Sequence, residues 1–206
     1  MAIGSIFGST IRPRLSQEEK TAETRKRLLD AAVLCLIEKG YANTTTSEIA
    51  ERAGLSRGAQ LYHFATKEDL LANAVEHLYE LQLSEFREQL SIIADDHDRR
   101  TAAIDKLWSF MTAPLTRAWI ELATASRTDS FLRDSIRTVS KRWQEAARDT
   151  FREVFPRPIA DDSDFELTPF MLLFLMEGLV LELPTLDSNL SERIVSALKR
   201  MQIQFS

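Results

Sequence analysis

Residues 45–66, TTSEIAERAGLSRGAQLYHFAT, predict two short helices joined by a tight turn. Thr45 followed three residues later by Glu48 is the pattern of a capping box, which predicts that the first helix begins there. Gly54 falls where a tight turn favours positive φ, and Ser56 can cap the second helix. A helix this short needs neighbours to hold it. The pattern predicts a helix-turn-helix whose second helix enters the major groove of DNA.

The sequence on either side of this motif has the apolar spacing of further helices. Apolar residues that recur every three or four positions predict a helix over 17–39 that ends at Gly40, and a long helix that begins at Lys67 after the cap Thr66. Further helices are predicted over about 101–112, 114–125, 130–155, 169–183 and 190–205, the fourth of them with Thr168 as N-cap. No segment alternates as a strand would, so we predict an all-α fold of about nine helices.

Charge and periodicity divide the 206 residues into three predicted parts. These are a disordered arm over 1–16, a helix-turn-helix DNA-binding domain over 17–66, and a helical domain over 67–206, which the features described below predict to be an effector-binding and dimerisation domain. The formal net charge is −5, but residues 1–66 carry +2 and the remaining residues carry −7. A mildly basic N-terminal part can approach phosphate while the acidic body keeps the protein soluble.

Cysteine usage and the first residues indicate a cytoplasmic protein. The single cysteine, Cys35, excludes an internal disulfide, and its apolar surroundings, AAVLCLI, are typical of a small buried side chain. The N-terminus has no charge before Arg12 and little apolar length, unlike a secretory signal. The longest apolar stretch, 170–183, carries Glu177 and Glu182 and is too short to span a bilayer.

Several short motifs occur at fixed spacing between residues 25 and 75. They are Gly40-Tyr41, Thr44-Thr45, Ile49-Ala50, Ala53-Gly54-Leu55-Ser56, Ala59, Tyr62-His63-Phe64 and Lys67-Glu68. With this set, the segment resembles the DNA-binding part of the TetR family of bacterial transcriptional repressors. The resemblance covers about a quarter of the chain. It implies a C-terminal helical domain with an effector cavity, and a four-helix interface built from the last two helices of two subunits.

Two adjacent positions depart from the family pattern. Gln60 stands where the family usually has an inward aliphatic residue, and Leu61 stands where a tyrosine near DNA is frequent. Either the helix is rotated so that Leu61 packs inward, or Gln60 stays inward and finds a polar partner. The second case makes Tyr62 the aromatic side chain at the phosphate or base edge.

Side-chain chemistry suggests a role for each candidate DNA contact. Arg57 can pair bidentately with guanine, and Gln60 can read adenine if it faces outward. Tyr62 and His63 can reach a phosphate or a thymine methyl group, and Lys67 can fix the register on the backbone. The predicted DNA-binding residues are Thr45, Ser56, Arg57, Gly58, Ala59, Gln60, Tyr62, His63 and Lys67. The alternative for each is an ordinary exposed side chain or a helix cap.

The C-terminal helices are rich in aromatic residues and methionine, which can line an adaptable apolar cavity. The predicted effector-binding residues are Trp108, Met111, Trp119, Trp143 and Phe174, with ordinary core packing as the alternative. The helix over 169–183 is apolar all round and needs a second surface to cover it. The predicted dimer interface comprises Phe170, Phe174, Leu190, Ile194, Leu198, Met201 and Phe205.

Together these patterns predict a ligand-responsive repressor that binds a palindromic operator as a homodimer and is released by a small, apolar or aromatic effector. The alternative is a DNA-binding activator or architectural protein with no small-molecule effector. We expect no enzyme, cofactor or metal site, because the sequence has no glycine-rich phosphate loop and no metal-spaced cysteine and histidine set. The acidic run Asp95–Asp98, with His97, is interpreted as a solvated loop.

Overall fold

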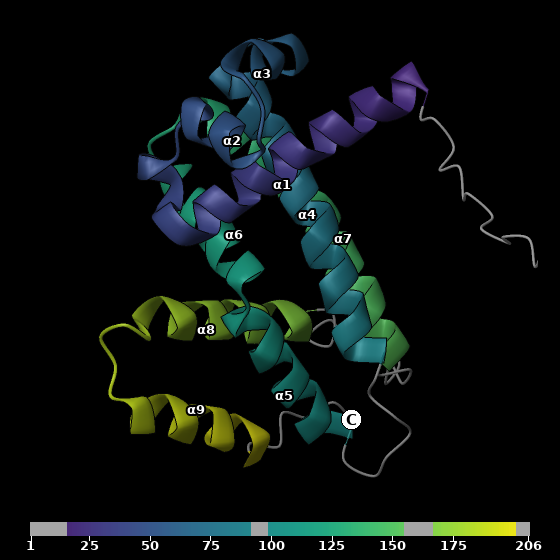
Figure 1. Cartoon of the computed structure of the whole chain (residues 1–206). Helices are drawn as coiled ribbons and strands as arrows, with labels where there is room; N and C mark the ends of the chain where they lie inside the picture. The colour runs from purple at the N-terminus through teal and green to yellow at the C-terminus, as the bar shows by residue number, and fades with distance from the viewer. Residues whose placement is uncertain (1–15, 92–98, 155–166, 201–206) are drawn as a thin grey trace, which may run out of the picture.

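The computed structural model describes residues 16–91, 99–154 and 167–200 of the chain, and these residues form nine α-helices and no strand (Figure 1). The first four helices are α1 (Gln17–Asn43), α2 (Thr46–Arg52), α3 (Arg57–His63) and α4 (Lys67–Ser91). The others are α5 (Arg99–Thr112), α6 (Pro114–Ala125), α7 (Ser130–Val154), α8 (Thr168–Glu182) and α9 (Ser188–Arg200). The all-α prediction is confirmed. Most of the predicted arm and the acidic run Asp95–Asp98 lie outside the described residues.

The helix starts differ from prediction in three places. At α1, Ser16 and Glu19 form a full capping box that was not predicted: the Ser16 Oγ accepts from the Glu19 amide at 3.1 Å, and the Glu19 carboxylate accepts from the Ser16 amide at 2.6 Å. At α2, the Thr45 hydroxyl accepts from the Glu48 amide at 3.3 Å, but the Glu48 carboxylate pairs with Lys39 instead of closing the predicted box. At α8 the N-cap is Leu167, one residue earlier than expected.

The N-terminal helices share a core with the start of α4. Buried apolar side chains from α1, α2 and α3's end contact Leu70 and Ala74, so the packed unit extends past the predicted boundary at residue 66. Cys35 lies inside this core, as expected for a small apolar side chain. Short helices α2 and α3 owe their stability to this shared burial, because neither is long enough to form alone.

The body of the molecule places α3 at one end and α8 and α9 at the other, with α4 and α7 running side by side between them (Figure 1). One apolar cluster joins α1, α4, α6 and α7, and a second joins α5, α8 and α9 to the far ends of α4 and α7. No helix in the described part of the chain combines the length and apolar character that crossing a bilayer demands.

Gly40 interrupts α1 with φ 71° and ψ 174°, a backbone conformation that is essentially restricted to glycine. A Cβ atom built there would lie 2.7 Å from a carboxylate oxygen of the exposed Glu121 side chain on α6, so that side chain would have to move, and the positive φ would remain strained. The bend turns the last residues of α1 towards α2 while the body of α1 stays packed on α6.

Gly40→Ala is therefore expected to lower the free energy of unfolding by about 1–3 kcal/mol, measured by urea denaturation. Gly58→Ala is the matched control, because the nearest atom to its added Cβ is the Ser56 Oγ at an ordinary 3.8 Å. Adding Glu121→Ala should return only the part of the loss that arises from steric overlap. Equal stability of Gly40→Ala and wild type would contradict the strained geometry.

Candidate DNA interface and effector cavity

The outward face of α3 exposes the side chains that can meet DNA. Arg57, Leu61 and Tyr62 are exposed. Tyr62 is 82% accessible, and the centroid of its ring lies 5.2 Å from that of His63 in an edge-on arrangement. Ser56 caps the helix by accepting from the Ala59 amide at 3.1 Å. This face combines an arginine and a phenol on a rigid helix, which is suitable chemistry for base edges and phosphates.

Gln60 does not belong to this face. Its side chain is only 1% exposed, and its amide nitrogen donates to the Phe64 carbonyl at 3.0 Å. The prediction that Gln60 reads adenine is therefore wrong. The structure selects the alternative in which Gln60 stays inward with a polar partner, because the end of α3 offers a carbonyl that the helix itself leaves free. Leu61 remains outward, about half exposed.

Two arginines of α1 hold α3, the second helix of the helix-turn-helix, in place, and the sequence motif did not reveal them. The Arg25 guanidinium donates to the His63 carbonyl at 2.9 Å and to Asn73 of α4 at 3.1 Å, and it lies 4.3 Å from the centre of the Phe64 ring. Arg27 donates to the Ala53 carbonyl beside the turn at Gly54. Both side chains belong to α1 and fix the orientation of α3. In the sequence, the only indication of this role was the positive charge of two residues in an amphipathic helix.

Lys67 is the first residue of α4 and lies where the N-terminal helices α1–α3 meet the rest of the molecule. Its ammonium lies 5.7 Å from the Tyr41 ring centroid, and the Tyr41 hydroxyl donates to the Asp129 carboxylate at 2.6 Å. Burial, and then the hydrogen bond to Asp129, raise the pKa of Tyr41 to about 12, so the phenol keeps its proton. The backbone amide of Leu132 and then Tyr41 lower the pKa of Asp129. This contact ties the end of α1 to the start of α7.

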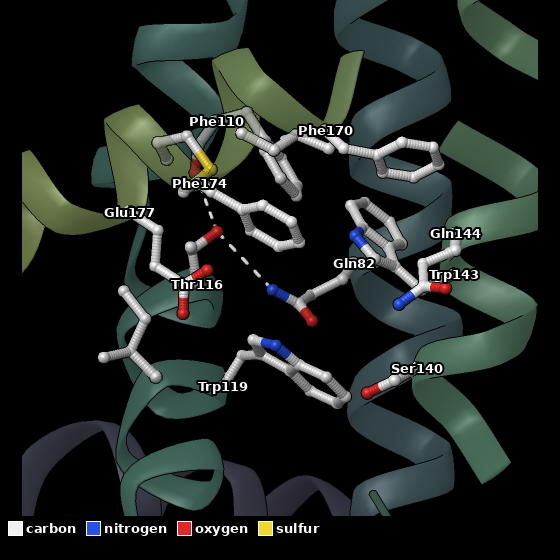
Figure 2. Close-up of a pocket in the computed structure, with 13 residues that line it drawn as sticks. Gln82, Phe110, Thr116, Trp119, Ser140, Trp143, Gln144, Phe170, Phe174 and Glu177 are labelled. Carbon is white, nitrogen blue, oxygen red and sulfur yellow. Dashed lines mark hydrogen bonds between the residues drawn. The ribbon is translucent and has the colours of Figure 1, made fainter. Parts of the chain in front are cut away.

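A compact cavity of about 100 Å³ lies in the body between α4, α5, α6, α7 and α8 (Figure 2). Four of the five predicted effector residues line it: Met111, Trp119, Trp143 and Phe174. Trp108 does not, because it lies one turn before Met111 on α5 and packs, partly buried, against the apolar cluster. Trp108 thus has the core-packing position that was its alternative, and effector binding by the other four residues stays a prediction.

Polar side chains also line the cavity, and composition alone did not reveal them. The Gln82 amide, from α4, donates to the Thr116 hydroxyl at 3.5 Å, and Thr116 in turn donates to the Phe110 carbonyl at 2.8 Å. Glu177, from α8, brings a carboxylate into the same space (Figure 2). The useful signal was an acid in the middle of α8, the most apolar of the described helices. The walls thus offer aromatic faces, two amides, two hydroxyls and one carboxylate.

The sequence is similar to those of known bacterial transcriptional regulators. The family model for bacterial regulatory proteins of the tetR family matches residues 28–74. An uncharacterised HTH-type transcriptional regulator of Mycobacterium tuberculosis is 31% identical over 137 residues, which cover 66% of this chain and 70% of the relative. The HTH-type transcriptional regulator CymR of Pseudomonas putida is 35% identical over 129 residues, 62% of this chain and 64% of CymR. The chain belongs to the TetR family.

Solved structures agree with this assignment at the level of the fold. A TetR-family protein from Rhodococcus sp. superposes with a TM-score of 0.67 at 20% identity, covering 87% of this chain and 96% of that one. A transcriptional regulator from Saccharomonospora viridis, solved in complex with choline, gives a TM-score of 0.65 at 22% identity over 87% of this chain and 95% of its own. The molecule is thus a TetR-family transcriptional regulator with the helical architecture of that family.

In this TetR-family chain, α8 presents an apolar face that no other described residue covers. The exposed side chains, which recur at helical spacing along it, are Leu167, Met171, Phe174, Leu175 and Leu181, and Leu190 of α9 lies nearby in sequence. Gly178 lies within the same stripe, and nothing stands within 4 Å of a Cβ added there. Large contiguous apolar patches of this kind are typical of interaction surfaces.

The predicted interface residues fall on different surfaces. Phe174 and Leu190 are exposed, whereas Phe170 is partly buried in the cavity wall. Ile194 packs, partly buried, against the subunit's own core. Leu198 is 5% exposed within that same core, so its prediction as an interface residue is wrong. Met201 and Phe205 lie outside the described residues.

Proposed function

We propose that this TetR-family transcriptional regulator is a homodimeric repressor that binds a palindromic operator and is released by a small effector. The observation that carries the proposal is the continuity of α4. Its first residue, Lys67, follows the reading helix by one short turn, and Gln82 of the same helix lines the cavity. A ligand that displaces Gln82 therefore acts on the helix that supports the DNA-reading unit.

On DNA, the proposed contacts are the exposed members of the predicted set. Arg57 and Tyr62 meet base edges or phosphates. Contacts to the DNA phosphate backbone come from Thr45 and Ser56 at helix N-termini and from Lys67 at the start of α4. Gly58, Ala59 and His63 complete the proposed surface. Gly58 has no side chain, so the backbone of α3 can lie close to the DNA backbone at this position.

For assembly, the proposed partner is a second copy of the chain. The apolar face of α8 has no cover within the described residues, and Gly178 leaves room for close approach of another helix. Two copies related by a two-fold axis would present their α3 helices to successive major grooves, about 34–36 Å apart, or a small multiple of a DNA turn. This geometry requires a palindromic site.

The proposed switch is a change in α4. A ligand shifts DNA affinity only if it prefers one conformation over the other. Filling the cavity between α4, α6 and α7 displaces α4, which tilts the reading helix and the Tyr41–Asp129 junction relative to the body. A coupling of about 1–3 kcal/mol would weaken operator binding by roughly 5–150-fold.

The test is to select operator DNA from a random duplex library with the purified protein, and then to measure its affinity against salt and ligand. We expect an inverted repeat, a steep fall in affinity as salt rises, and at least one small molecule that weakens DNA binding and is itself weakened by operator to the same degree. Selection of a single, non-repeated site would overturn the dimeric arrangement. Effector-independent binding across a broad ligand panel would favour an architectural protein or a constitutive activator.

A further inference from the structure

We propose that the effector is a cation, an ammonium or quaternary ammonium group held by the Glu177 carboxylate between the rings of Trp119 and Phe174. This inference rests on the proposed function, because it names the chemical class of ligand that the cavity accepts. Figure 2 shows the Gln82 amide between the Phe174 ring and the Trp119 ring, and the Glu177 carboxylate at the side of the same space.

In the described part of the chain, the cavity wall carries one ionisable side chain, which is acidic. Among the described residues that line it, Glu177 alone is ionisable; the other polar side chains there are neutral amides and hydroxyls. Arg148 lies over the Phe170 ring, 5.6 Å from its centroid, but does not line the cavity. An anionic ligand would therefore meet a like charge, whereas a cation would meet the single formal charge of opposite sign.

The position of Glu177 is the second step. On α8 the cavity-facing residues are Phe170, Leu173, Phe174 and Glu177, which follow one helical stripe whose first three members are apolar. A fourth apolar residue would complete the packing, yet the stripe ends in a carboxylate. Burial raises the pKa of Glu177, and no described residue forms a hydrogen bond or an ion pair with its carboxylate. Glu177 is partly buried, and a carboxylate in this position that has no described partner is available to a ligand.

The aromatic rings are the third step. Trp143 already stacks on Phe110, with centroids 5.6 Å apart and planes 17° apart, and it also meets Phe86. Trp119 and Phe174 have no ring partner in the part of the chain that the structure describes. Their faces are therefore available to a cation, whose attraction to an aromatic face adds to that of the carboxylate.

Gln82 links such a cation to the switch. Its hydrogen bond to Thr116 is 3.5 Å long, at the outer limit of such bonds, so a ligand can replace it at little cost. A positively charged head beside Glu177 also lies beside the Gln82 carboxamide, whose oxygen is attracted to positive charge. The cavity of about 100 Å³ accommodates a small head group.

The experiment compares probes that have the same shape and different charge. Phenyltrimethylammonium, its neutral isostere tert-butylbenzene and the anion benzenesulfonate are titrated by tryptophan fluorescence and by operator release. We expect the cation to bind the wild type roughly 10-fold or more tightly than the neutral probe. Glu177→Gln should remove this preference and leave binding of the neutral probe unchanged. Glu182→Gln, on the same helix but outside the cavity wall, is the control for charge.

Thermal unfolding shows whether Glu177→Gln has folded. Burial raises the pKa of Glu177 in the folded state, so ionisation of this side chain makes the folded protein less stable as pH rises through that pKa. Glu177→Gln carries no charge and should therefore unfold at or above the wild-type temperature at pH 7. The difference should shrink as pH falls through the raised pKa and Glu177 takes up a proton.

Three outcomes overturn the inference. If cation and isostere bind equally, or if the preference survives in a folded Glu177→Gln, the carboxylate does not select the ligand. If the neutral or anionic probe releases operator and the cation does not, the switch stands and the cationic class is wrong. If no probe of any charge binds while the protein still selects an inverted repeat, this inference fails and the proposed operator binding stands.

Discussion

Met171→Glu combined with Leu175→Glu is expected to convert the protein into a monomer and to weaken operator binding by about 100-fold or more. Both side chains lie on the uncovered face of α8, Met171 being 67% exposed, so charge there costs the single subunit little. In a dimer the same carboxylates would be buried opposite their own copies without partners. Because each half-site alone binds weakly, loss of the pair removes most of the affinity.

Light scattering combined with size exclusion measures the mass, and a gel shift measures the affinity. Phe131→Glu is the matched control, since Phe131 is also exposed but lies on α7. It should stay dimeric and bind operator as before. Leu198→Glu is unsuitable as a test because its side chain is buried in the core of its own subunit. A wild-type chain that is already monomeric, or a double variant that stays dimeric, would rule out this interface.

Arg57→Ala is expected to weaken binding to the selected operator by about 1–3 kcal/mol, which is roughly 5–150-fold, and to relax base preference at one position of each half-site. The reason is the exposed position of Arg57 at the first turn of α3, where a guanidinium can reach a guanine edge. Lys67→Ala, by contrast, should weaken all sequences alike and reduce the salt dependence, as expected for a phosphate contact.

Fluorescence anisotropy with operator and single-base variants separates the two effects. Arg137→Ala removes the same charge from an exposed site on α7 and should leave both affinity and specificity unchanged. Gln60→Ala should lower stability, because it removes the bond to the Phe64 carbonyl, without changing base preference. Unaltered specificity in Arg57→Ala would mean that another element reads the bases.

The fold was predictable because its signals are local. Caps and breaks such as Ser56, Thr66, Gly40 and Gly54 act on the residues next to them, and apolar spacing determines which side of each helix turns inward. The structure therefore reproduces the number and order of the predicted helices in its described part. The motif over residues 45–66 is contiguous and dense in fixed positions, so it indicates the family by its own residues.

Side-chain placement was predictable only in part, because it depends on what lies across from each helix. Trp108 and Met111 sit one turn apart on α5, yet only Met111 lines the cavity, since α6, α7 and α8 meet around that turn. Leu198 has the spacing of an interface residue, but α9 turns that side towards its own subunit. Periodicity identifies an apolar stripe and does not say which surface covers it.

The sequence by itself therefore determined the helices, their order and the family, since these depend on contacts within a few residues or on a contiguous motif. Tertiary structure alone decided that Gln60 faces inward, that Arg25 clamps the end of α3, and that Glu177 reaches the space beside Gln82. Each of these depends on a partner distant in the chain or on the direction of one side chain. Such contacts arise only when helices pack, because packing decides which polar group finds a partner and which stays available to a ligand.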